Sequence, residues 1–173
     1  KEVGAPVAEL LAEERGDGET DDDLPLYASA GMYMEPEGYA EQAQILEDLG
    51  FFGYKYRPGI GPAGDRETVD ALSEAVSDIE VMIDAHTWWK LESGYDPDTV
   101  DDMARYAAEN DVYWLEEPVA PDDYDGYRRL AVETDVPLAG GESEPDVDGL
   151  RALADTGAVS FLQGDVRHHG GFT

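Results

Sequence analysis

Residues 81–86 read Val-Met-Ile-Asp-Ala-His, three apolar residues followed by an acid, a small residue and a histidine. Successive apolar side chains are typical of a parallel strand that helices cover on both faces. Because side chains alternate along a strand, we expect Asp84 and His86 to point to the same side. In an α/β barrel, that side at the C-terminal end of the strand faces the active site. Alternatively, Asp84 caps the next helix and His86 is an ordinary loop residue.

Strand-length apolar runs alternate with helix-length segments along most of the chain, with short connections between them. This alternation predicts right-handed βαβ units and a parallel sheet, an α/β fold. Six strands fall short of the eight of a closed barrel, so the sheet is either open and doubly wound or a piece of a barrel. The end of the chain after a glycine pair favours a piece. The predicted strands are 24–29, 51–57, 79–86, 112–116, 136–140 and 158–163, and the predicted helices are 1–15, 36–49, 65–77, 96–109, 122–133 and 145–154.

Composition restricts the possible partners and compartments. The 173 residues are enough for one domain, and 42% hydrophobic content is enough for a core. A net charge of −30, from 41 acidic and 11 basic residues, argues against nucleic acid as a partner, because phosphate binding needs a basic patch. There is no cysteine, no apolar run that could span a membrane and no basic-start signal peptide. We therefore expect a cytoplasmic protein without disulfide or thiolate chemistry.

Three acids follow three successive predicted strands: Asp84, Glu116 and Glu142. Neighbouring strand ends in a parallel barrel would bring these carboxylates together, where they repel one another unless a cation compensates them. Oxygen-only ligands point to a hard divalent cation, and we predict Mg²⁺. The alternative is that these acids only cap helices, since a chain this acidic has many acids to place.

Cations and one further acid are predicted to face the same end of the sheet. Lys55, one of only three lysines, shares a strand face with Arg57. These two side chains could bind a substrate carboxylate or neutralise developing charge. Asp165 follows the sixth predicted strand and completes the set. The alternative for Lys55 and Arg57 is an ordinary surface position.

Together these motifs resemble the enolase superfamily, mandelate racemase subgroup, over nearly the whole chain. The resemblance implies about six βα units of a modified (β/α)7β barrel of the TIM type, with the capping domain and the last strands missing. Residues 1–23 would be the tail of the N-terminal capping region and a linker, and residues 24–173 an incomplete barrel domain. We expect such a piece alone to be inactive. The matching motifs are GYKYR at 53–57, IDAH at 83–86, WLEEP at 114–118, PLAGGE at 137–142, LQGD at 162–165 and GG at 170–171.

The resemblance also implies roles for these residues. Asp84, Glu116 and Glu142 would be the Mg²⁺ ligands, with Glu117 beside them rather than on the metal. Lys55 would bind the substrate carboxylate. Asp165 would orient a histidine base that lies beyond Thr173.

Two positions depart from the usual pattern of the family. Arg57 replaces a lysine that acts as a base, and an arginine stays protonated at ordinary pH. His86 stands where many members carry asparagine, which is similar to galactonate dehydratase-type enzymes, where this histidine is the acid for the departing hydroxyl. Imidazole titrates near neutral pH and suits that role. Trp88 and His169 are candidate substrate contacts. The alternative for Trp88 is packing under the loop predicted at 87–95.

The resemblance therefore implies Mg²⁺-dependent abstraction of the proton alpha to a carboxylate, with dehydration of a sugar acid to a 2-keto-3-deoxy product. The predicted catalytic set is His86, Asp165, Lys55 and Arg57. Two alternatives stay open, a racemase or epimerase of a 2-hydroxy acid and a non-catalytic barrel that binds a divalent cation. By analogy with the family, we expect a homo-oligomer, either a dimer or an octamer, with a small-molecule partner and no membrane partner.

The dense acidic charge resembles that of proteins from salt-loving archaea, where concentrated salt screens self-repulsion. We predict that the chain folds poorly at low ionic strength. Thermal unfolding followed with and without molar KCl checks this, and we expect a clearly higher midpoint in KCl. Equal midpoints would contradict the prediction.

Overall fold

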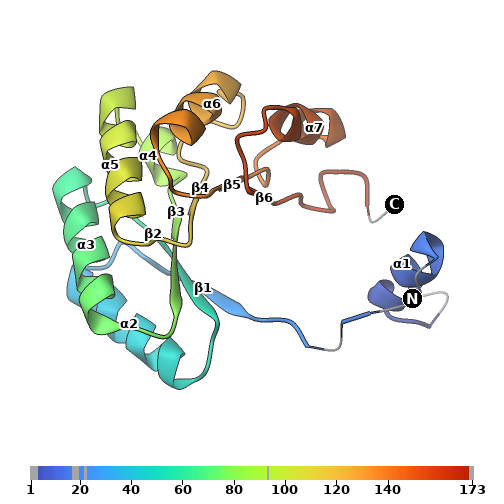
Figure 1. Cartoon of the computed structure of the whole chain (residues 1–173), viewed down its shortest axis with the longest axis horizontal. Coiled ribbons are helices and arrows are strands. Elements are labelled where there is room, and N and C mark those ends of the chain that lie inside the picture. Colours follow the sequence, from blue (N-terminus) through green and yellow to red (C-terminus); the bar gives the residue numbers. More distant parts are fainter. Residues whose placement is uncertain (1–3, 17–19, 22, 93, 172–173) are drawn as a thin grey trace.

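The computed structural model describes residues 4–16, 20–21, 23–92 and 94–171. Six parallel strands form one open sheet in chain order, β1 to β6, and most of the helices pack along one side of it (Figure 1). The expected parallel α/β sheet is thus confirmed. The strands are β1 Tyr27–Met32, β2 Gly53–Arg57, β3 Glu80–Asp84, β4 Trp114–Glu116, β5 Leu138–Gly140 and β6 Phe161–Leu162. The helices are α1 Val7–Arg15, α2 Pro36–Asp48, α3 Pro62–Ala75, α4 Thr87–Lys90, α5 Pro97–Glu109, α6 Tyr124–Glu133 and α7 Val147–Asp155.

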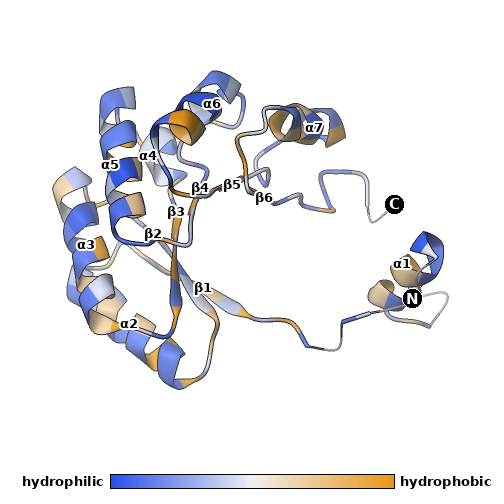
Figure 2. Ribbon diagram, viewed as in Figure 1, coloured by the Kyte–Doolittle hydropathy of each residue, from blue (hydrophilic) through white to orange (hydrophobic). Residues whose placement is uncertain are grey.

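The two faces of the sheet have separate cores, because side chains alternate along each strand. The helix-covered face carries the larger core, and its strand side chains are almost completely shielded from solvent. The opposite face has a smaller cluster of Met82, Trp114 and Ala139. In Figure 2, hydrophobic colours mark part of β3, whereas hydrophilic residues cover much of the helices. The strand residues of the larger core are Tyr54, Tyr56, Ile83, Leu115 and Leu138.

Strand register sets the positions of the predicted site. Lys55 on β2 is the partner of Met82 on β3, and Asp84 on β3 is the partner of Glu116 on β4. The face of the sheet that carries the smaller core therefore also carries Lys55, Asp84 and Glu116, near the C-terminal ends of three adjacent strands. Apolar residues lie below them on the same face.

Two local predictions were wrong. The segment 87–95, predicted as a loop, contains the short helix α4. Helix α3 begins at Pro62, inside a segment that its proline and glycine content marked as loop. Proline is favoured at the first helical position because its fixed φ suits a helix and its missing N–H costs nothing there.

Helix α1 lies away from the sheet, at the end of an extended segment (Figure 1). It begins at Val7, and residues 1–3 of the helix predicted at 1–15 lie outside the described residues. Among the helices that the structure describes, none combines the length and the apolar character needed to cross a membrane.

Candidate active site

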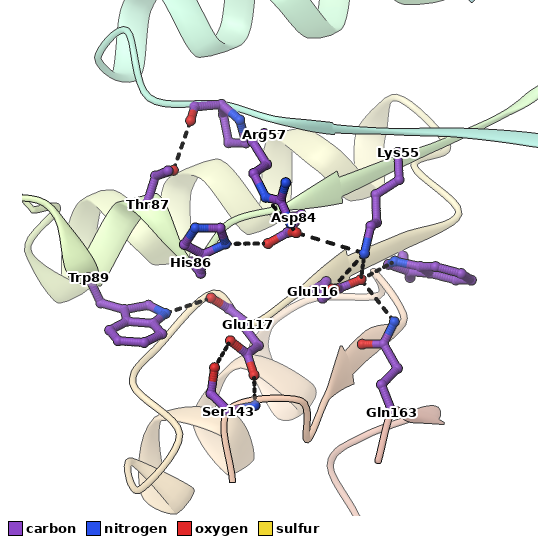
Figure 3. A network of polar contacts seen from close by, with 12 residues as sticks. Lys55, Arg57, Asp84, His86, Thr87, Trp89, Glu116, Glu117, Ser143 and Gln163 are labelled. Atoms are coloured by element: carbon purple, nitrogen blue, oxygen red, sulfur yellow. Dashed lines mark hydrogen bonds and ion pairs between the residues drawn. The ribbon is translucent and has the colours of Figure 1, made fainter. Parts of the chain in front are cut away.

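Four predicted site residues meet at the C-terminal ends of β2, β3 and β4 (Figure 3). Lys55 and Arg57 extend from β2 toward Asp84 on β3, and Glu116 lies on β4. This confirms that Lys55 and Arg57 share one face of their strand. His86 contacts the same aspartate, so the two side chains lie together as expected. The predicted strand 79–86 is too long, however: β3 ends at Asp84, and His86 has a helical conformation at the start of α4, so strand alternation does not place it.

Lys55 and Glu116 form a buried ion pair. The Nζ of Lys55 donates to both carboxylate oxygens of Glu116, at 2.7 and 2.8 Å, and lies 3.7 Å from Oδ2 of Asp84. Their side chains are 6%, 1% and 2% exposed, respectively. Burial alone would lower the pKa of Lys55, but Glu116 and Asp84 outweigh it, and the pKa is raised. Lys55 is therefore a fixed positive charge between two buried carboxylates.

The Glu116 carboxylate is held by two further donors. Nε1 of Trp114 donates to Oε2 at 3.2 Å, and Nε2 of Gln163, just past β6, donates to the same oxygen at 2.9 Å. Donors from two strands, β2 and β4, and from the residue after β6 thus fix its orientation. Neither Trp114 nor Gln163 was predicted as a site residue. The sequence did carry a signal for both residues. Trp114 lies two positions before Glu116, and Gln163 two positions before Asp165, so each was expected on the same strand face as a predicted site residue.

Asp84 is shared by an arginine and a histidine. Nε of Arg57 lies 3.1 Å from Oδ2 of Asp84, and Nδ1 of His86 hydrogen-bonds Oδ1 at 2.7 Å. Because an ionised carboxylate can only accept, the hydrogen of this bond lies on Nδ1. The bond leaves Nε2 as the ring nitrogen of His86 that can exchange a proton with another molecule.

The predicted Mg²⁺ ligands are only partly assembled. Asp84 and Glu116 are adjacent oxygen donors of the kind a hard cation prefers. Oδ2 of Asp84 is buried and makes no hydrogen bond, although Lys55 and Arg57 lie against it as ion-pair partners. Glu142 is exposed at the next strand end and lines a cavity of about 370 Å³ that Lys55 and Glu116 also line. Within the described residues, no three carboxylate, histidine or cysteine side chains group closely enough to hold a metal. The three-ligand assignment stays a prediction.

Glu117 fastens two strand ends together. Its carboxylate accepts hydrogen bonds from the backbone N–H of Ser143 at 3.0 Å and from the Ser143 hydroxyl at 2.7 Å. Burial raises the pKa of Glu117. The residue adopts φ of +45°, a conformation that is uncommon outside glycine, and its carbonyl accepts from Nε1 of Trp89 at 2.9 Å. Glu117 therefore braces the segment that follows Glu142.

Besides Glu142, three further predicted site residues lie outside this network of contacts. Asp165 lines the same cavity as Glu116, but its carboxylate pairs with Arg167, which lowers the pKa of Asp165. Nε2 of His169 lies 3.2 Å from the carbonyl oxygen of Glu144. Trp88 is 1% exposed, and Nε1 donates to Asp65 at 3.1 Å. Trp88 is therefore a buried packing residue and does not form a surface that a substrate could contact.

The sequence matches a family of enzymes. Residues 38–173 match the family described as "Enolase C-terminal domain-like". The chain is 34% identical to D-galactarolactone cycloisomerase of Agrobacterium fabrum, over 100% of this chain and 44% of that protein. It is 30% identical to L-rhamnonate dehydratase of Saccharopolyspora erythraea, over 97% of this chain and 40% of that protein. The chain thus spans less than half the length of these relatives.

Solved structures of similar proteins share the fold. The 3,6-anhydro-D-galactonate cycloisomerase from Zobellia galactanivorans superposes with a TM-score of 0.75 at 33% identity, covering 86% of this chain and 40% of that one. A racemase from Streptomyces coelicolor A3(2) with bound magnesium gives a TM-score of 0.74 at 28% identity, covering 86% and 41%. The open sheet is thus part of a larger barrel-type architecture in these structures.

We predict that Lys55→Met lowers the free energy of unfolding by roughly 3–5 kcal/mol, because it leaves buried carboxylates without their cation. Adding Glu116→Gln to that variant should restore part of the loss. Urea unfolding in high salt with EDTA measures both effects. Arg151→Met is the matched control, since it removes the same formal charge from a side chain that is 72% exposed. Equal losses in Lys55→Met and Arg151→Met would contradict the prediction.

Proposed function

The chain belongs to the enolase C-terminal domain-like family, and on that premise we propose that it carries the acid and the metal ligands of a Mg²⁺-dependent sugar-acid dehydratase. The observation that carries the proposal is the hydrogen bond between His86 and Asp84 beside Arg57 and Lys55. This hydrogen bond leaves Nε2 of His86 available, next to the cations of Lys55 and Arg57, at the C-terminal end of the sheet. Relatives described as dehydratases and cycloisomerases of sugar-derived acids and lactones support the substrate class.

The cations would bind the substrate carboxylate. Lys55 is buried and permanently charged, whereas Arg57 is 30% exposed and can turn a free edge of its guanidinium toward a ligand. Mg²⁺ held by Asp84, Glu116 and Glu142 would stabilise negative charge that develops on that carboxylate as the alpha proton leaves. Magnesium bound in a structural neighbour supports this choice of metal.

His86 would protonate the departing hydroxyl at the beta carbon. Its Nδ1 is tied to Asp84, so Nε2 is the atom that would give the proton. Arg57 cannot serve as the base, because a guanidinium stays protonated. We assign the base to a histidine outside residues 1–173 that Asp165 would orient, after Asp165 leaves Arg167.

We also propose that residues 1–23 are the tail of a capping region and a linker, and that the barrel domain begins at residue 24. The position of α1 away from the sheet supports this division (Figure 1). A cytoplasmic homo-oligomer, dimeric or octameric, remains our proposal for the protein.

The assay uses the complete gene product that carries this chain, with Mg²⁺ and a library of sugar acids in heavy water at high salt. We expect a 2-keto product, lost on chelation of the metal. His86→Asn should lower product formation by about 10²–10⁴-fold, the usual contribution of a general acid, while deuterium still enters the alpha carbon.

Other outcomes would change the assignment. Deuterium exchange or stereoinversion without keto product in the wild-type protein would indicate a racemase or epimerase. Bound Mg²⁺ with neither signal would leave a metal-binding barrel and overturn the proposed chemistry.

A further inference from the structure

We propose that Asp65 is a positioning residue for His86, acting through helix α4. The inference rests on the proposed function for its effect on the reaction, but the contacts that carry it belong to the fold. Asp65 lies in the first turn of α3 and is 1% exposed. A carboxylate so deeply buried is costly unless its oxygens are fully satisfied. The hydrogen-bond donors to Asp65 therefore identify the segments that this residue holds in place.

Four donors converge on Asp65, and they come from three separate segments. Oδ1 accepts from the backbone N–H groups of Gly59 at 3.0 Å and Ile60 at 3.2 Å, in the loop between β2 and α3. Oδ2 accepts from Nε1 of Trp88 at 3.1 Å and from the hydroxyl of Tyr95 at 2.6 Å. One oxygen thus serves the loop of its own helix, and the other is committed to α4 and the segment after it.

On the α4 side of this network, Trp88 and Tyr95 also contact each other. The rings of Trp88 and Tyr95 stack with centroids 5.4 Å apart and 22° between their planes. Burial and Asp65 raise the pKa of Tyr95, so its hydroxyl remains a protonated donor. The backbone N–H of Tyr95 also donates to the carbonyl of Trp88 at 2.7 Å. Asp65 therefore holds a preformed aromatic unit, not a single flexible side chain.

Helix α4 follows His86 directly, and three consecutive side chains attach it to different neighbours. Thr87 donates to the carbonyl of Pro58 at 2.8 Å, Trp88 donates to Asp65, and Trp89 donates to the carbonyl of Glu117 (Figure 3 shows the first and the third). Only the bond to Asp65 has an ionised acceptor, and such bonds are roughly twice as strong as neutral ones. His86 is the N-cap residue of α4, so a shift of this helix moves the imidazole away from Asp84.

A role confined to the β2–α3 loop would need only one oxygen of Asp65. The Asp65→Asn variant separates the two roles, because asparagine has a single acceptor oxygen for four donors. With its oxygen toward Gly59 and Ile60, it keeps the loop and releases Trp88 and Tyr95. The Tyr95→Phe variant is the matched control, since it keeps the ring stack and the bond between Asp65 and Trp88.

The experiment measures two quantities in the complete protein at high salt with Mg²⁺. The first is the ratio of 2-keto product formed to alpha deuterium incorporated. Partial unfolding lowers both signals equally, whereas a displaced acid lowers only the product. We expect Asp65→Asn to lower the ratio about 10-fold or more, within the range that one general acid contributes, and Tyr95→Phe to change it little. Trp88→Phe, a milder change if Asp65→Asn folds poorly, should lower the ratio in the same direction.

The second quantity is backbone hydrogen exchange of α4, which does not depend on any activity. Asp65→Asn should speed exchange at residues 88–91 while the amides of α3 stay protected. Faster exchange with an unchanged product ratio would overturn the positioning role and leave a structural one. Unchanged exchange at residues 88–91 would contradict the proposal that Asp65 holds α4 in place. If the wild-type protein turns over no sugar acid, the proposed function fails, and the exchange result still decides whether Asp65 holds α4.

Discussion

The ammonium group of Lys55 makes the rest of this site possible. Glu116 and Asp84 lie on paired positions of adjacent strands and are both almost fully buried, so their charges would otherwise repel in a medium that screens poorly. Lys55 bonds both oxygens of Glu116 and lies within 4 Å of Asp84. The protein can therefore hold two carboxyl groups side by side at the ends of adjacent strands while the sheet packs around them.

The smaller core of the sheet, which packs beneath Lys55 and Glu116, strengthens this arrangement. Trp114, Met82 and Ala139 form the small core on this face, and Tyr27 packs edge-on against Trp114. Nζ of Lys55 lies 5.6 Å from the ring centroid of Tyr27, within cation–π range. Trp114 both fills this core and donates a hydrogen bond to Glu116. Packing and electrostatics are thus coupled through the same residues, so a change in this core would also reorient the carboxylate.

Much of this arrangement could be predicted because strand chemistry is local. Alternation along β2 placed Lys55 and Arg57 on one face, and the structure shows both against Asp84. The contact between Asp84 and His86 was also expected, although His86 follows β3 in a helical conformation and does not extend the strand. Helix α4 and the role of Trp88 were out of reach, since they depend on Asp65, 23 residues away in the sequence. A buried aspartate among many surface acids has no local signature. Its meaning appears only when the fold brings its donors together.

The residues around Asp84 also constrain the direction of the chemistry. Racemisation needs two groups that exchange protons on opposite faces of one carbon. Arg57 stays protonated, and Lys55 is held as a cation between carboxylates. Of the described side chains that contact Asp84, only His86 is an imidazole, a group that can both give and take a proton. This part of the site can supply one proton from one direction, and elimination, with its base on another element, requires no more than that.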